Sequence, residues 1–228
     1  MKKTTVADEH TKPFFVRLRK IPGDHWYLPE KGNTKNKQKM PKSYLTHDFS
    51  INQISFFNNQ VWYYFEGENT SGWLAKRNIS KAFRRLAVKP LKQRTATDLD
   101  NYVAALMMLF DYADQPMDEA KLRDWVQGWH DNSRKLLDLS ELIINQTNSI
   151  RDLNQADFRQ LNRQLLRGRP ILLRVNGLDN LKSNVIVLTG FNRKLYYYNN
   201  PWSGKLEVIS QKHLKHFWKN GSYEAISY

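Results

Sequence analysis

The C-terminal third of the chain has the clearest alternation of apolar and polar segments. Residues 185–189 form an almost unbroken apolar run, which predicts a strand buried on both faces. Residues 190–193 predict a turn, and the aromatic residues 195–198 predict a second strand. Asn184 opens the first strand and Asn200 closes the second. The pattern therefore places two amide side chains at strand ends.

The N-terminal part of the chain alternates with the shorter period of β-strands. Residues 50–57 and 61–65 read as strands, and the Asn-Asn-Gln segment between them is a hairpin signal. Residues 1–12 are polar and predict a flexible N-terminus. Residues 31–42 are rich in Lys and Asn, which indicates an exposed loop.

Helical spacing begins after residue 85. Thr97 and Asp98 can cap a helix over 99–112, which is apolar nearly all round and is therefore expected to be a buried central helix. Further helices are predicted at 118–129, 136–144, 152–167 and 211–219, and further strands at 170–175, 206–209 and 223–227. Helices followed by antiparallel strands are typical of α+β folds.

These patterns predict an α+β protein with three parts. We expect a flexible segment over 1–12, a small all-β module over 13–85, which the resemblance described below implies is barrel-like, and a domain over 86–228. The larger domain should combine a helical half with an antiparallel sheet. The length of 228 residues allows one large domain or two small ones.

The composition limits which partners and reactive groups this protein can use. The net charge is +14, of which residues 1–85 carry +9 and the rest +5. Such an excess favours anionic partners, although a solvated lysine-rich surface explains it equally well. The sequence has no Cys, so it has no thiol nucleophile and no disulfide. No motif indicates a metal or a cofactor, and no apolar run is long enough to span a membrane.

The C-terminal motifs resemble a papain-fold cysteine peptidase-like family related to bacteriocin-leader (double-glycine) peptidases. Family members read H-x-V-V-L-T-G-Y, Y-Y-N-D-P-W-x-G and x-A-I-S-Y, whereas this chain reads N-V-I-V-L-T-G-F, Y-Y-N-N-P-W-S-G and E-A-I-S-Y. The resemblance implies a papain-like domain. It places Asn184 at the family's catalytic His and Asn200 at its Asp.

Residues 88–112 align without a gap with another sequence block of the same family, the one that contains its catalytic Cys. There the resemblance places Gln93 at the glutamine that stabilises the oxyanion, and Asn101 at the catalytic Cys. A carboxamide is neither a nucleophile nor a general base at neutral pH. None of the six His residues falls on the family's His position. The degenerate positions Gln93, Asn101, Asn184 and Asn200 are thus expected to share one cleft without catalysing hydrolysis.

The N-terminal aromatics resemble a GW module, a bacterial barrel of the Src-homology-three type. The runs Val-Trp-Tyr-Tyr at 61–64 and Gly-Trp-Leu at 72–74 carry this resemblance. In that family the modules bind lipoteichoic acid or peptidoglycan. The resemblance makes Trp62, Tyr63 and Trp73 candidate ligand-binding residues, and Trp202 is a fourth candidate in the larger domain. The alternative is that the aromatics fill a small β-core.

Three functions remain open on the sequence. The first is a non-catalytic peptidase-like protein that binds a peptide or an anionic cell-wall polymer. The second is a hydrolase that uses residues away from the family positions, and the third is a nucleic-acid-binding protein, suggested by basic and aromatic residues. The sequence leaves localisation and oligomeric state open: the family resemblance points to a Gram-positive cell envelope, and the absence of a signal peptide points to the cytoplasm.

Overall fold

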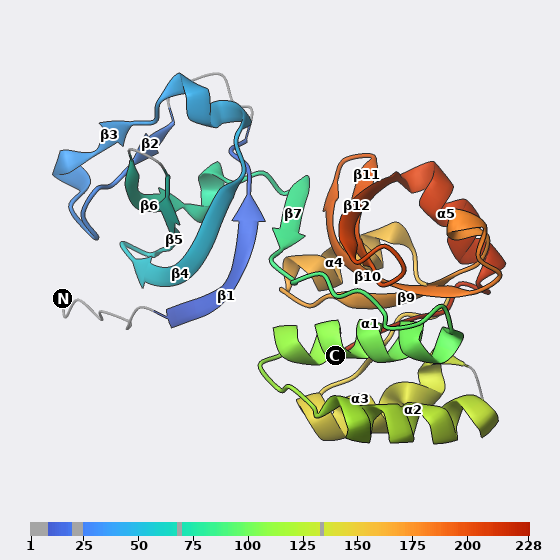
Figure 1. Cartoon of the computed structure of the whole chain (residues 1–228). Helices are drawn as coiled ribbons and strands as arrows, with labels where there is room; N and C mark the ends of the chain where they lie inside the picture. Colours follow the sequence, from blue (N-terminus) through green and yellow to red (C-terminus); the bar gives the residue numbers. More distant parts are fainter. Residues whose placement is uncertain (1–8, 20–24, 68–69, 133–134) are drawn as a thin grey trace. The chain divides into compact units, whose positions relative to one another are not determined.

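The computed structural model describes residues 9–19, 25–67, 70–132 and 135–228. The chain divides into two compact units, Met1–Ala87 and Val88–Tyr228, which we describe one at a time (Figure 1). Within the described residues, no helix is both long enough and apolar enough to cross a membrane.

The first unit is built from antiparallel strands. Four of them pair in the order β6-β5-β4-β1, and β7 pairs with the other side of β1. The strands are β1 (Glu9–Val16), β2 (Trp26–Tyr27), β3 (Gln38–Lys39), β4 (Phe49–Phe57), β5 (Gln60–Glu66), β6 (Ser71–Ala75) and β7 (Phe83–Leu86). The hairpin signal holds, because Asn58 and Asn59 form the β4–β5 turn with positive φ angles of 51° and 56°.

The start of this unit differs from the expectation for a flexible segment over 1–12. Glu9 and His10 pair with β4, opposite Ile54 and Gln53, so β1 already includes residues 9–12. The β4 edge supplies hydrogen-bonding partners to these polar residues, which the local sequence pattern could not reveal. Residues 1–8 lie outside the described residues.

An antiparallel sheet organises the second unit. Its strands pair in the order β12-β11-β10-β9-β13-β8. They are β8 (Arg151–Asp152), β9 (Ile171–Val175), β10 (Asn184–Asn192), β11 (Leu195–Asn200), β12 (Lys205–Ser210) and β13 (Ala225–Ser227). Eight of the nine residues of β10 are buried, as the unbroken apolar run predicts.

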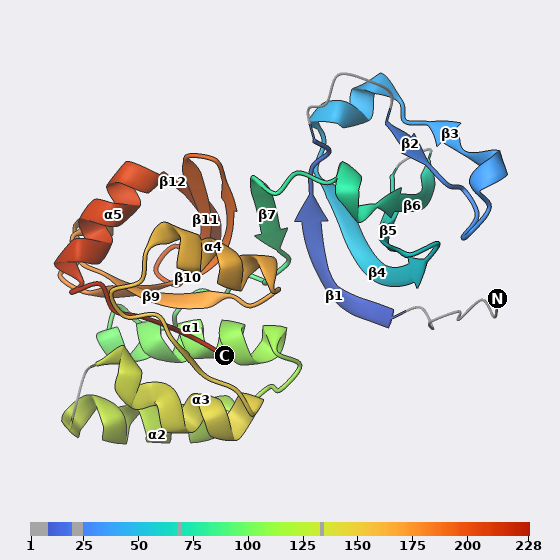
Figure 2. The ribbon, with the colours of Figure 1, turned by 180° about the vertical axis from the view of Figure 1, so that it is seen from behind.

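Helices cover both faces of this sheet. They are α1 (Asp98–Tyr112), α2 (Glu119–Asn132), α3 (Ser140–Thr147), α4 (Phe158–Leu166) and α5 (Gln211–Asn220), with a 3₁₀ turn at Leu136–Leu139 before α3. Helix α1 lies against one face with α2 and α3 beyond it, and α4 and α5 lie on the other face (Figures 1 and 2). The Thr97 side chain caps α1 by accepting from the Asp100 amide, as predicted.

Two boundaries in the second unit correct the sequence prediction. The fourth helix begins at Phe158, not near residue 152, because Asp157 and Gln160 form a capping box and Arg151–Asp152 pairs with β13 instead. The turn between β10 and β11 contains only Arg193 and Lys194, so the strands are longer than expected. The pairing between the strands continues through Gly190, Phe191 and Asn192, which had suggested a turn.

Candidate functional site

Three asparagine side chains from separate elements meet at one end of β10. Asn101 lies in the first turn of α1, Asn184 is the first residue of β10, and Asn200 is the last residue of β11. Asn101 Nδ2 donates to Asn184 Oδ1 at 2.7 Å, and Asn184 Nδ2 donates to Asn200 Oδ1 at 3.4 Å. These hydrogen bonds join the three side chains directly, so the three positions converge at one end of β10. We call these three side chains the asparagine chain.

Backbone donors fix the direction of the asparagine chain. The Val185 amide donates to Asn101 Oδ1 at 2.6 Å, so the nitrogen of Asn101 faces Asn184. The Trp202 amide donates to Asn200 Oδ1 at 3.1 Å, so the nitrogen of Asn200 faces away from Asn184. Each amide therefore accepts from the preceding group and donates to the next.

The asparagine chain ends on two carboxylates that the sequence motifs did not indicate. Asn200 Nδ2 donates to Asp179 Oδ2 at 2.7 Å and to Glu207 Oε2 at 3.3 Å. Glu207 faces Tyr198 across the β11–β12 pair, so the register of a predicted hairpin could have indicated it. Asp179 lies in the short turn Leu178–Asn180 with a φ of 54°, and no sequence signal connects it to the site.

Hydrogen bonds set the charge state of Glu207. Burial alone would raise the pKa of this carboxyl, but donation from Ser203, Tyr198 and Asn200 lowers the pKa below its ordinary value. Ser203 Oγ donates at 2.5 Å and the Tyr198 hydroxyl at 2.6 Å. Burial and the Glu207 carboxylate both raise the pKa of Tyr198. The far end of the asparagine chain therefore rests on an ionised carboxylate at neutral pH.

Gln93 joins the same cluster but does not present an open donor. Its Oε1 accepts from Asn101 Nδ2 at 3.1 Å, and its Nε2 donates to the carbonyl oxygens of Thr95 at 2.6 Å and Thr97 at 3.5 Å. The Gln93 amide hydrogens are thus used within its own loop. An oxyanion-stabilising group would need a donor aimed at the reacting atom instead.

A charged network lies beside the asparagine chain. The Asp100 carboxylate accepts from the Thr95 amide at 2.7 Å and also from the Thr95 hydroxyl and the Arg123 guanidinium. Burial raises the pKa of Asp100, but these hydrogen bonds outweigh burial and lower the pKa below its usual value. The hydrogen bonds of Arg123 to Asp100 and to Glu119 raise the pKa of Arg123. The contacts of Asp100 tie the start of α1 to the preceding loop and to α2.

The asparagine chain is buried as well as hydrogen-bonded. The exposed fractions of Asn101, Asn184 and Asn200 are 5%, 2% and 0%, and that of Gln93 is 7%. Carboxamides do not titrate near neutral pH. The asparagine chain can therefore fix the positions of its side chains but cannot carry a proton from one residue to the next. No group of three or more His, Cys, Asp or Glu suited to a metal ion occurs among the described residues.

Solved structures identify the fold that carries this arrangement. A "putative C39-like peptidase" from Bacillus anthracis is similar to the chain, with a TM-score of 0.51 and 16% sequence identity. The match covers 62% of this chain and 94% of that protein, and Val88–Tyr228 alone makes up the same share of this chain. The chain has a C39-like peptidase fold. This confirms the α+β fold expected from the sequence, while the low identity says nothing of activity.

More distant matches add nothing to this assignment. A "putative autolysin" from Listeria monocytogenes matches with a TM-score of 0.28 and 9% identity, over 91% of this chain and 62% of that protein. That score is too low to compare folds. No protein-family model matches the chain, and no curated protein matches it.

The aromatic candidates of the first unit lie in its core. The exposed fractions of Trp62, Tyr63 and Trp73 are 8%, 4% and 5%, and Phe57 stacks on Trp62 with ring centroids 4.7 Å apart. Residue 72, next to Trp73, is a glycine because a Cβ there would lie 2.6 Å from the Leu28 carbonyl oxygen. The ligand-contacting role expected of these three rings does not fit their burial, because packed rings have no face free for a ligand.

The exposed aromatics are different residues. Trp202, the fourth candidate, is 38% exposed and directly follows Pro201 beside the asparagine chain. In the first unit, Trp26 is 37% exposed, and the Lys37 ammonium lies 5.1 Å from the centre of its ring. Trp26 lies in β2, five residues before the lysine-rich segment 31–42, and the nearness of that segment could have indicated this surface from the sequence.

Proposed function

We propose that the chain is a peptidase-like protein that binds its ligand without hydrolysing it. The observation that carries this proposal is the asparagine chain: Asn101, Asn184 and Asn200 adjoin one another where the family resemblance puts the nucleophile, the base and the orienting residue. The chain contains no Cys, and the three carboxamides cannot generate a nucleophile or accept its proton. The C39-like fold supports a peptidase-related origin.

The position of Asn101 favours this interpretation over an unrelated polar cluster. A papain-type nucleophile sits at the start of a helix, where the helix dipole stabilises a thiolate. Asn101 occupies the first turn of α1, and its backbone N–H donates to the carbonyl oxygen of Thr97. Asn184 reaches it from the sheet at hydrogen-bonding distance. This arrangement supports the assignment of Asn101 and Asn184 to the positions of a thiol and an imidazole.

The proposed equivalence of positions can be tested by restoring the missing groups. An Asn101→Cys variant introduces the only thiol of the chain, and an Asn101→Cys/Asn184→His variant adds an imidazole beside it. Thiolate absorbance should then appear at a lower pH in the double variant, because a neighbouring imidazolium stabilises the thiolate. Asn101→Cys/Asn220→His is the matched control, since Asn220 is exposed at the end of α5.

The controls decide the outcome of this titration. Circular dichroism checks that all three variants fold. A thiol pKa in Asn101→Cys/Asn184→His at least about one unit below that of the control supports the equivalence, because an ion pair at this distance changes pKa values by about that much or more. Identical titrations of the two double variants would show that Asn184 does not occupy the base position.

We further propose that the first unit acts as a GW-like module that binds an anionic cell-wall polymer. The basic excess of residues 1–85 and the exposed Trp26 with Lys37 support this reading. Binding of lipoteichoic acid should weaken steeply with salt, because the attraction is between exposed charges. Comparison with single- and double-stranded DNA at matched salt tests it. A preference for DNA at physiological salt would favour the nucleic-acid alternative.

A further inference from the structure

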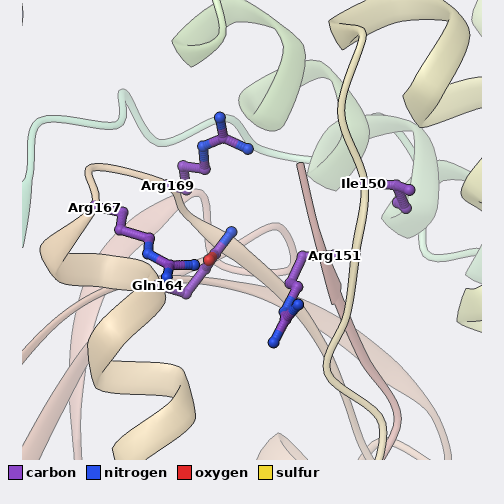
Figure 3. A pocket seen from close by; sticks show the side chains of 5 residues that line it. All are labelled: Ile150, Arg151, Gln164, Arg167 and Arg169. Atoms are coloured by element: carbon purple, nitrogen blue, oxygen red, sulfur yellow. The ribbon is translucent and has the colours of Figure 1, made fainter.

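Three arginines surround a cavity far from the asparagine chain. The cavity has a volume of about 420 Å³ and is lined by Ile150, Arg151, Gln164, Arg167 and Arg169. Figure 3 shows the Arg167 side chain extending toward Gln164, with Arg151 and Arg169 on its other sides and their guanidinium groups directed away from it. The volume lies within the range of about 300–1,000 Å³ that is typical of small-ligand sites.

The register of the sheet separates this cavity from the asparagine chain. Arg169 lies two residues before Ile171, the first residue of β9, whereas Asn184 faces Val175 at the other end of that strand. Four residue steps of a β-strand span about 13 Å. The cavity is therefore a second site in the same unit, and it includes none of the positions that the family resemblance indicated.

Part of the cavity is held rigidly. Gln164 is 3% exposed, and its Nε2 donates to Ser227 Oγ at 3.0 Å and to the main-chain oxygen of Tyr228 at 2.9 Å. Arg169 donates to Ser149 Oγ at 2.6 Å, and its guanidinium lies 5.3 Å from the centre of the Tyr228 ring. One wall of the site and one of its cations are thus fixed before any ligand arrives.

The side chains that line the cavity carry three positive charges and no negative charge. No Asp or Glu side chain lines it. Across the described ranges, none of Arg151, Arg167 and Arg169 forms an ion pair with another residue, whereas other arginines of this unit, such as Arg123 and Arg174, do. Three guanidinium groups at one cavity repel one another, so an anion that neutralises them would be stabilised there.

We propose that this arginine pocket binds a phosphate group, either free or as a phosphate ester. Guanidinium groups donate pairs of parallel hydrogen bonds that match the oxygens of a phosphate. A phosphate has enough oxygens and charge to engage more than one guanidinium at once, and a single carboxylate has only two oxygens. The proposal does not depend on whether the asparagine chain is catalytic.

The test is a nuclear magnetic resonance titration of the full chain with inorganic phosphate, with glycerol 1-phosphate and with acetate at constant ionic strength. The Gln164 side-chain amide is the reporter, because it lines the pocket and is buried. Both phosphates should shift this signal with saturation, and acetate should bind at least about tenfold more weakly, since charge-assisted hydrogen bonds to one guanidinium are lost. Tighter binding of the ester would identify a phosphate ester as the source.

A pair of charge-matched variants makes the assignment specific. Arg151→Gln/Arg167→Gln removes two of the three pocket cations, and Arg159→Gln/Arg163→Gln removes two cations from α4 that do not line the pocket. Phosphate affinity should fall at least about tenfold in the first variant and stay within about twofold in the second. Equal loss in the two variants, acetate binding as strong as phosphate binding, or no saturable shift of Gln164 would overturn the proposal.

Discussion

Asp100 and Asn101 are consecutive residues in the first turn of α1, but their side chains enter networks of opposite character. Asp100 accepts from Thr95 and Arg123, and its pKa is lowered by these contacts. Asn101 joins Gln93 and Asn184 through neutral amides. Both side chains are buried, with exposed fractions of 3% and 5%. The two networks differ in charge and not in burial.

This difference shows what each network can contribute. The Asp100 network links protonation to folding, because its carboxylate is stabilised only in the folded state. The asparagine chain has no group of its own that titrates near neutral pH, so it can contribute positioning and stability but no proton transfer. Asp100 thus shows that this helix start can hold a titratable group. Asn101, which we propose stands at the nucleophile position, provides none.

The largest effect is expected from Asn101→Ala. The change leaves the Val185 amide, Asn184 Oδ1 and Gln93 Oε1 without the partner that Asn101 supplies. Because buried unpaired polar groups cost about 1–3 kcal/mol each and can partly relax, the unfolding free energy should fall by about 3 kcal/mol. Urea denaturation followed by circular dichroism measures the loss.

The exposed Asn220→Ala variant on α5 is the control for Asn101→Ala, and its unfolding free energy should change by no more than about 0.5 kcal/mol. The loss in Asn101→Ala should also be equal at pH 7 and pH 4, because no amide changes its charge between them. A loss as small as that of the control would mean that water replaces the asparagine chain without cost.

A smaller and pH-dependent effect is expected from Asp100→Asn. At pH 7 the variant should lose about 2 kcal/mol, because hydrogen bonds to a charged group contribute about 1.5–3 kcal/mol. The folded pKa of Asp100 lies below its ordinary value of 3.8, so the wild-type advantage is complete above that value. It is lost as the pH falls through the lower, folded pKa.

Unfolding curves at several pH values between about 2 and 7 measure this dependence, with Asn101→Ala as the pH-independent reference. The gap between wild type and Asp100→Asn should narrow as the pH falls below 3.8. A gap that stays constant with pH would place the contribution of Asp100 in packing or neutral hydrogen bonding, and the contrast between the two networks would disappear.

The sequence was most informative where local pattern and long-range packing agree. The capped, apolar helix α1 and the apolar strand β10 could be predicted, and with them the ends at which Asn101 and Asn184 lie. Burial on both faces leaves such elements few alternative positions. The family resemblance then supplied the pairing that periodicity alone could not.

Other features depend on partners that are distant in sequence. The first residues of β1 are ordered by β4, and Asp179 reaches Asn200 through a turn with positive φ. The aromatic pattern of the first unit is the same whether Trp62 faces a ligand or the core, and only the tertiary structure distinguishes the two. The arginine pocket likewise assembles from a short strand, a helix end and a loop.

Peptide hydrolysis is the measurement that tests the central claim most directly. Wild type and Asn101→Ala are incubated for a long period with diverse fluorogenic peptides and with peptides that carry a double-glycine leader. We expect no turnover above buffer in either, because the proposed function assigns carboxamides to the nucleophile and base positions. Turnover that persists in Asn101→Ala would reveal an active site elsewhere. Turnover abolished by that change, in a variant that circular dichroism shows to be folded, would show that Asn101 itself is catalytic. Both results contradict the account.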